Sequence, residues 1–194
     1  MARVRSLTIG SMAERRGCKV ALIKLYATRR PPGAAKVRLR VLGSVALMLQ
    51  ADYNRGTKDG DVLESAPINQ AIKTELLGLG GKGTALAKRH DLYLDIVAGG
   101  ILFLPAATIY HPLPGLSIAL NCFDVEVMDI QDACVTKLKR FNANDQTDIA
   151  AMTRLGKLDH ACFLGRFHQV ERDIFLVTET HIDLMGRRPD VAYK

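Results

Sequence analysis

The sequence lacks an apolar run long enough to cross a membrane. Its longest apolar stretch, Ile96 to Tyr110, is interrupted by Gly99-Gly100 and by Pro105, whereas a membrane-spanning helix needs about 20 consecutive apolar residues. The basic N-terminal residues are not followed by the apolar core and small-residue cleavage site of a signal peptide. We therefore expect a soluble protein of the cytoplasm with no membrane partner.

Cysteine and histidine are also sparse, with four and five copies. The cysteines form no CxxC pair, none is spaced against a histidine like a zinc ligand, and there is no HExxH sequence. This argues against a structural zinc site or a zinc hydrolase. Disulfides are not expected in a reducing compartment, so we interpret the cysteines as free thiols that are mostly buried.

Two further patterns are missing. The glycine-rich segment Gly78 to Thr84 is not a P-loop, because Gly83 separates Lys82 from the threonine. We expect this segment to be a loop that ends the preceding helix. Tryptophan is absent, and the few aromatic residues are not interleaved with basic ones, which gives little support to sequence-specific RNA recognition by stacking.

Positive charge is in excess, with a formal net charge of +7. Much of the excess lies in the first forty residues, which contain arginine and lysine in many positions. Such a balance favours an anionic partner: nucleotide phosphates, nucleic acid or an acidic protein. A basic surface that is simply solvated is an equally good interpretation.

The order of apolar patterns predicts an α/β (α+β) protein with a mixed, partly antiparallel sheet flanked by helices, followed by a helical C-terminal part. The expected strands are 37–41, 59–63, 92–97, 102–104, 108–111, 116–120 and 125–127. The expected helices are 45–50, 71–77, 85–90, 130–141, 145–155 and one capped by Asp159. We divide the chain into a basic N-terminal segment (1–36), a core (37–127) and the helical part (128–194).

Three aspartates carry the chemistry that the sequence suggests. Asp59 and Asp61 are two residues apart in a predicted strand, so their side chains leave the same face about 6.6 Å apart. Asp95 lies in an otherwise apolar strand, where a carboxylate is costly unless it is paired, neutralised or bound to metal. If these strands are neighbours, the three carboxylates form a hard-oxygen site suited to Mg²⁺ or Mn²⁺. Taken singly, each has a structural alternative: a turn cap, or an ion pair with arginine.

The same residues resemble the nucleotidyltransferase superfamily with the DNA polymerase beta-type core. The resemblance lies in a strand, Gly43-Ser44, a helix, the sequence Arg55-x-Thr57-x-Asp59-x-Asp61, and the later Asp95. Residues 126–140, followed by Asp145-x-x-Asp148, are similar to the helical half of small bacterial nucleotidyltransferase-like proteins. Relatives of those proteins include the abortive-infection and toxin–antitoxin nucleotidyltransferases. The resemblance covers about residues 37 to 155.

The resemblance implies roles for six residues. Asp59, Asp61 and Asp95 would bind the metal ions, and Asp95 would also activate the acceptor hydroxyl. Gly43 and Ser44 would hold the triphosphate through backbone N–H groups at a helix N-terminus, and Lys137 would face the nucleotide phosphates.

Three more residues match the helical pattern of that family: Arg140, Asp145 and Asp148. Their role is either in the site or purely structural, as a salt-bridged pair of helices.

The activity implied is metal-dependent transfer of a nucleoside monophosphate from an NTP such as ATP to a hydroxyl on RNA or protein. A toxin–antitoxin or phage-defence role, with an antitoxin partner, would accompany it. The alternative is a catalytically inactive protein of the same fold that binds a protein or nucleic-acid partner, because fold alone does not determine activity.

Overall fold

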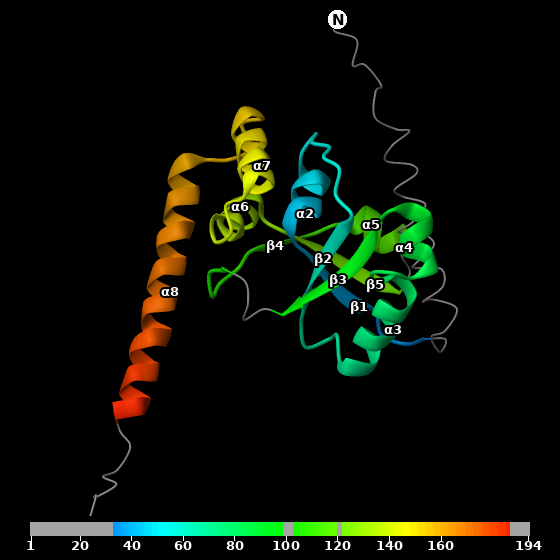
Figure 1. Ribbon diagram of the computed structural model, residues 1–194, viewed down its shortest axis with the longest axis horizontal. Helices are drawn as coiled ribbons and strands as arrows, with labels where there is room; N and C mark the ends of the chain where they lie inside the picture. The colour runs from blue at the N-terminus through cyan, green and yellow to red at the C-terminus, as the bar shows by residue number, and fades with distance from the viewer. Residues whose placement is uncertain (1–32, 99–102, 120–121, 187–194) are drawn as a thin grey trace, which may run out of the picture.

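A mixed five-stranded sheet with the order β3-β2-β1-β5-β4 forms the centre of the protein (Figure 1). The computed structural model describes residues 33–98, 103–119 and 122–186. The strands are β1 (Val37–Val41), β2 (Asp59–Glu64), β3 (Tyr93–Ala98), β4 (Tyr110–Pro112) and β5 (Phe123–Met128). The described helices are α2 (Gly43–Gln50), α3 (Gln70–Gly80), α4 (Ala85–His90), α5 (Pro114–Ala119), α6 (Ile130–Leu138), α7 (Ala143–Arg154) and α8 (His160–Gly186). The expected α/β class is confirmed.

Strand pairing brings the N-terminus of α2 beside the middle of β2. β1 is antiparallel to β2 and parallel to β5, and β2 is parallel to β3. At the end of β1, the Leu42 N–H donates to the Asp61 carbonyl at 2.9 Å. Gly43 then begins α2, so the Gly-Ser turn predicted from the sequence lies directly next to the predicted Asp-x-Asp strand.

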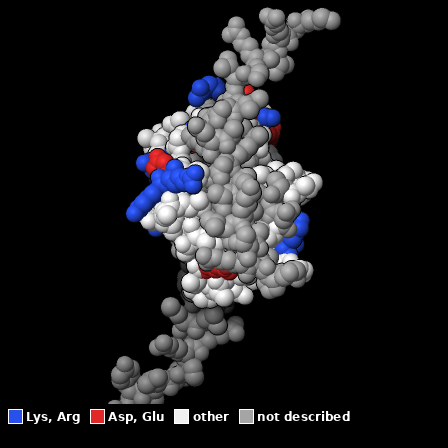
Figure 2. Space-filling view, turned by 90° about the vertical axis from the view of Figure 1, so that its right-hand side faces the viewer, with Lys and Arg blue, Asp and Glu red and all other residues white. Residues whose placement is uncertain are grey.

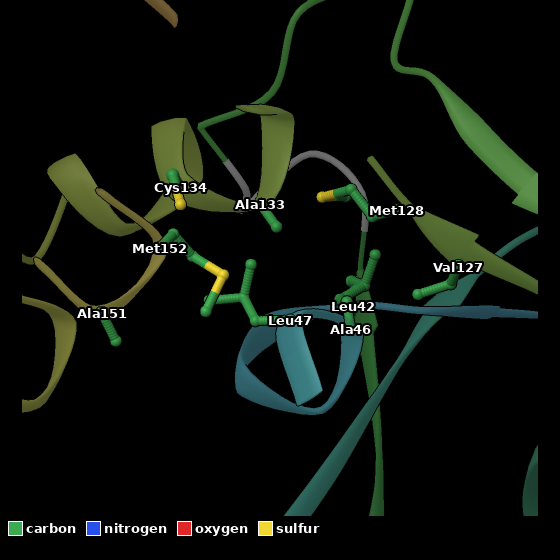
Figure 3. Close-up of a cluster of buried hydrophobic side chains, with 9 residues drawn as sticks. All are labelled: Leu42, Ala46, Leu47, Val127, Met128, Ala133, Cys134, Ala151 and Met152. Atoms are coloured by element: carbon green, nitrogen blue, oxygen red, sulfur yellow. The ribbon is translucent and has the colours of Figure 1, made fainter. Parts of the chain in front are cut away.

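Two apolar clusters stabilise this arrangement. The first lies between the sheet and α3, and it contains Val37, Val62, Ile68, Leu76, Ile96, Phe123 and Val125. The second joins α2 to α6 and α7, with the side chains of Leu47, Cys134 and Met152 lying close to one another (Figure 3). Because Leu47 and Met152 are fully buried, the second cluster fixes the helical part against the helix that starts at Gly43.

Two expected strands are wrong. Residues 103 and 104, the described part of the expected strand 102–104, are neither strand nor helix. Residues 116–120 were expected to be extended, but 114–119 form helix α5. Pro114 occupies the first helical position, where its fixed φ and missing N–H are tolerated. The Ser117 hydroxyl bonds to the Leu113 carbonyl at 3.1 Å and accepts from the Val125 N–H at 2.9 Å. A short apolar run does not distinguish a helix from a strand by periodicity alone.

The C-terminal helices begin at polar caps, of which the sequence indicates Asp129 and Asp159. Asp129 accepts from the Gln131 N–H, and Asn142 forms a capping box with Asp145 at the start of α7. Asp159 accepts from the Cys162 N–H at 2.7 Å, as expected for the cap of α8. In Figure 1, α8 runs beside α6 and extends well beyond it.

A buried ion pair fastens α8 to α6. Asp132 on α6 is fully buried, and its carboxylate contacts Arg166 on α8 at 2.5 and 2.7 Å. The same carboxylate accepts from the Ile109 N–H at 2.8 Å. Arg166 also donates to the Ala107 carbonyl. The pair therefore holds three segments together: α6, α8 and the chain that leads into β4.

The surface and the thiols can be compared with the sequence expectations for the described residues. None of the described helices is both long and apolar enough to cross a bilayer. The basic residues of the described surface are not gathered in one place. On the face shown in Figure 2, the visible described lysines and arginines form separate groups instead of one continuous patch. The basic residues before position 33 lie outside the described residues. Cys122, Cys134 and Cys162 are free, as expected, but only Cys134 of these three is buried and Cys162 is exposed, so the expectation of mostly buried thiols is wrong for the described cysteines. Cys18 lies outside the described residues.

Candidate active site

The three predicted carboxylates meet at one pocket. Asp61 on β2 lies directly opposite Asp95 on the parallel strand β3, so their side chains leave the same face of the sheet. Asp59 precedes Asp61 by two residues and shares that face. All three line a cavity of about 550 Å³. Sequence spacing and strand adjacency thus place the three acids together, and their catalytic role stays a prediction.

Asp61 is the electrostatic centre of the group. Burial, followed by the negative charges of Asp59 and Asp95, raises the pKa of Asp61 to about 6. The positive charges of Lys137 and Arg140 act in the opposite direction without cancelling the effect. The three carboxylates therefore carry more negative charge than the neighbouring cations of the protein neutralise. A bound cation would reduce the repulsion between them.

Asp95 corrects one sequence argument. We inferred its importance from the cost of burying a carboxylate in an apolar strand, but its side chain is exposed. β3 is an edge strand of the sheet, and Asp95 is accessible at the open side of the pocket that it lines. The position of Asp95 opposite Asp61, and not its burial, is what connects it to the site.

Gly43 allows the backbone to approach the carboxylates. Its φ is +62°, in the left-handed region that glycine adopts without strain. A Cβ at this position would collide with Oδ2 of Asp61. Together with the absence of a side-chain cap at Leu42, this leaves the first N–H groups of α2 beside the pocket that Gly43 and Ser44 line.

Replacing Gly43 with alanine should therefore lower stability and displace Asp61. We expect Gly43→Ala to lose about 1–3 kcal/mol in the free energy of unfolding, measured by urea denaturation. Gly78→Ala is the matched control, because a Cβ there meets nothing within 4 Å inside α3; it should gain about 0.5–1 kcal/mol. Equal stability of the two variants would contradict the close approach described for Gly43.

A buried polar network lies behind the pocket and is centred on Asp148. This carboxylate, fully buried on α7, accepts from the Ser44 hydroxyl at 2.6 Å and the Tyr53 hydroxyl at 2.5 Å. Lys137 Nζ lies 2.7 Å from it and Arg55 Nε lies 2.9 Å from it. Burial alone would raise the pKa of Asp148, but the hydrogen bonds from Lys137, Ser44 and Tyr53 and the charge of Lys137 lower it.

Asp145 forms the second half of the network. Arg140 donates two hydrogen bonds to its carboxylate, at 2.9 and 3.0 Å, and Lys137 Nζ lies 3.3 Å away. Burial opposes ionisation, yet the Arg140 hydrogen bond and the Lys137 charge leave the pKa of Asp145 lowered. The ion pairs expected for salt-bridged helices are present, but Arg140 and Asp145 also line the pocket, so a role of these residues in the site stays a prediction.

This network qualifies the predicted roles of Ser44 and Lys137. The Ser44 hydroxyl accepts from Arg55 and Lys137 and donates to Asp148, so a phosphate would meet the backbone N–H of Ser44 rather than its hydroxyl. The Lys137 ammonium is almost completely buried between two carboxylates, although the residue also lines the pocket. Both nucleotide-binding roles stay predictions.

Sequence reasoning missed several residues of the pocket wall. Arg55 lines the pocket and Tyr53 lies behind it, bonded to Asp148, and the sequence patterns assigned a role to neither. Lys139 and Phe103 line the same pocket as the carboxylates. Arg55 stands two residues before Thr57, whose hydroxyl bonds to Asp59. This position in the motif is the signal that could have indicated a place for Arg55 in the pocket. Nothing in the sequence around Phe103 separates it from a core residue.

The fold and this pocket together define a class. A mixed sheet that carries acids on two adjacent strands, next to a helix that begins at Gly-Ser, is a nucleotidyltransferase-like arrangement. Residues 32–180 match the family model described as "Nucleotidyltransferase of unknown function (DUF6036)", and the chain belongs to this family. No match was found among curated proteins or among solved structures.

Proposed function

We propose that this protein is a metal-dependent nucleotidyltransferase that moves a nucleoside monophosphate from an NTP to a hydroxyl acceptor. The observation that carries the proposal is the register of β2 and β3, which sets Asp61 directly opposite Asp95. The family description supports the same activity. Arg55, Lys137 and Arg140 line the pocket that holds these acids, so one cavity offers carboxylates for cations and cations for phosphates.

The donor set fits Mg²⁺ or Mn²⁺. All three acids offer hard oxygen donors, and the raised pKa of Asp61 reflects burial and unrelieved repulsion from its two acidic neighbours. Within the described residues, no three acidic, histidine or cysteine side chains form a ready-made metal group, so side-chain adjustment would accompany binding. When bound, the metal would neutralise charge on the phosphates and on the oxygens being exchanged.

The reaction assigned to the pocket is an in-line displacement at the α-phosphorus. The acceptor oxygen bonds to that phosphorus, the bond to the bridging oxygen of the β-phosphate breaks, and pyrophosphate leaves with the bond electrons. Asp95, exposed beside the pocket, receives the proton of the acceptor hydroxyl. The first N–H groups of α2 and the cations of the pocket wall orient the triphosphate.

Transfer from α-³²P-labelled NTPs tests this function. Asp59→Asn and Asp95→Asn should each reduce label transfer by at least about a hundredfold, with the fold retained, because each removes one acid from the site. Asp124→Asn is the matched control: Asp124 is a strand aspartate outside the pocket, in an exposed pair with Lys36. If all three variants transfer label like the wild type, the assignment is wrong.

Metal binding should depend on pH through Asp61. Because its pKa in the metal-free protein is about 6, a proton competes with the metal below that value. The apparent affinity for Mn²⁺ should fall about tenfold per pH unit below pH 6 and level off above it. Calorimetric titrations with Mn²⁺ at several pH values measure this. A flat profile from pH 5 to 7.5 would contradict the role of Asp61.

An inactive binding protein is the second candidate. It is favoured by the Ser44 hydroxyl and the Lys137 ammonium, which are both engaged by buried aspartates. Calorimetry with Mg²⁺ and each NTP distinguishes the two: an active enzyme binds the pair and turns over, whereas the alternative binds neither or binds without turnover. A toxin–antitoxin role belongs to the first candidate and predicts that the protein co-purifies with the product of an adjacent small gene.

A further inference from the structure

The pocket is polarised, with its cations at one end. Lys137, Lys139 and Arg140 come from the end of α6 and the turn after it. Lys137 Nζ lies 3.2 Å from the Ser44 hydroxyl in the first turn of α2, which follows β1, and β1 lies on the side of β2 away from β3. The cationic wall therefore lies on the side of Asp61 away from Asp95.

The opposite end of the pocket is apolar and aromatic. Val97 follows Asp95 by two residues on the same face of β3, on the side away from Asp59. Phe103 lines the pocket with it. The Phe103 ring lies 6.1 Å from the ring of Phe167 on α8, at an interplanar angle of 52°. The second ring supports the first, so Phe103 is a half-buried wall of the pocket and not a loose surface side chain.

In-line displacement assigns a substrate to each end. The leaving pyrophosphate carries most of the negative charge and belongs with the cations on the side of Asp61 away from Asp95. The attacking oxygen must enter on the side of the phosphorus opposite the leaving group. That direction points to the Asp95 end, so the acceptor lies against Val97 and Phe103. This step rests on the proposed function.

We propose that Phe103 is the acceptor-binding wall and that it stacks on the terminal base of a single-stranded nucleic acid, whose 3′ hydroxyl is presented to Asp95. An aromatic ring beside the reacting hydroxyl can stack on a nucleobase, because the ribose that carries the hydroxyl also carries the base. The net charge of +7 favours a polyanion over a neutral acceptor. One ring accommodates one base, so the protein recognises the end of a strand and not a sequence, in agreement with its low aromatic content.

Fluorescence anisotropy with a matched pair of RNA probes tests the proposal without chemistry. The first probe is a 5′-labelled oligoribonucleotide of about ten residues. The second is identical except that its 3′-terminal ribose carries no base. The wild-type protein should bind the first probe about ten- to a hundredfold more tightly, as expected for one stacked base. Phe103→Leu should abolish the difference, and Phe103→Trp should retain it.

Two controls separate stacking from folding. Ile118→Ala removes an exposed apolar side chain of α5, outside the pocket, and should leave the preference for the complete probe unchanged. Melting temperatures of the Phe103 variants show whether the contact with Phe167 has been replaced by a stable packing. Because leucine retains apolar volume and tryptophan retains the ring face, a folding defect shared by both cannot explain opposite binding results.

The outcomes are distinct. A Phe103→Leu protein that still prefers the complete probe would overturn the proposal, and so would weaker NTP binding with unchanged RNA binding, since the ring would then contact the donor. Wild-type transfer to a protein hydroxyl, with no base-dependent RNA binding, would overturn it too. Base-dependent binding that Phe103 controls, but without NTP-dependent transfer, would support this acceptor site and reject the proposed enzyme activity.

Discussion

Asp148→Ala should lower the free energy of unfolding by about 3–5 kcal/mol. The carboxylate is fully buried and contacts Ser44, Tyr53, Arg55 and Lys137. Its removal leaves the Lys137 ammonium buried with one acidic partner fewer, and an uncompensated buried charge costs far more than a lost surface pair. Urea denaturation followed by circular dichroism measures the change.

The matched control for this prediction is Asp124→Ala. Asp124 also pairs with a lysine, but both side chains of the pair are about half exposed. Exposed pairs contribute about 0–1 kcal/mol, so this variant should unfold almost like the wild type. A similar small loss in Asp148→Ala would mean that the network does not hold α7 against α2.

Asp61→Asn should abolish transfer and yet make the protein more stable at neutral pH. The folded-state pKa of Asp61 is raised from 3.8 to about 6, so the folded protein holds its proton more tightly than the unfolded chain. Its contribution to stability is therefore lost as pH rises from about 4 to about 6, and at pH 7.5 the ionised group destabilises the fold. Removing the charge should recover up to about 3 kcal/mol.

Thermal unfolding in metal-free buffer checks this prediction across pH. The melting temperatures of wild type and Asp61→Asn should converge at about pH 4 and separate as pH rises to 7.5, with the variant higher. Transfer activity should fall by at least about a thousandfold, in a variant that is better folded than its parent. If Asp61→Asn were less stable than the wild type at pH 7.5, a positively charged group of the protein itself would have to stabilise the ionised Asp61.

Local sequence patterns predicted the site better than its surroundings. Alternation of apolar and charged residues in 37–41 and the Asp-x-Asp spacing fixed the faces of two strands, because side chains alternate strictly in a strand. The polar caps at Asp129 and Asp159 marked two helix starts for an equally local reason. What these patterns could not supply was the pairing of β2 with β3, which was an assumption until the structure showed Asp61 opposite Asp95.

The network around Asp148 was out of reach of the sequence for a physical reason. Ser44 and Asp148 are 104 residues apart, and only the packing of α2 against α6 and α7 brings them together. The spacing of Arg140, Asp145 and Asp148 indicated charged helices but not which cation would be buried. The strand predicted at 116–120 was wrong for a different reason: its short apolar run fits the periodicity of a helix as well as that of a strand.

Manganese binding measured by electron paramagnetic resonance tests the central claim most directly: that Asp59, Asp61 and Asp95 form one cation site. At pH 7.5 the wild type should deplete the free Mn²⁺ signal, Asp61→Asn should not, and Asp59→Asn and Asp95→Asn should each weaken binding at least about tenfold, with Asp124→Asn unchanged. Equal Mn²⁺ binding by the wild type and all three pocket variants would contradict the account.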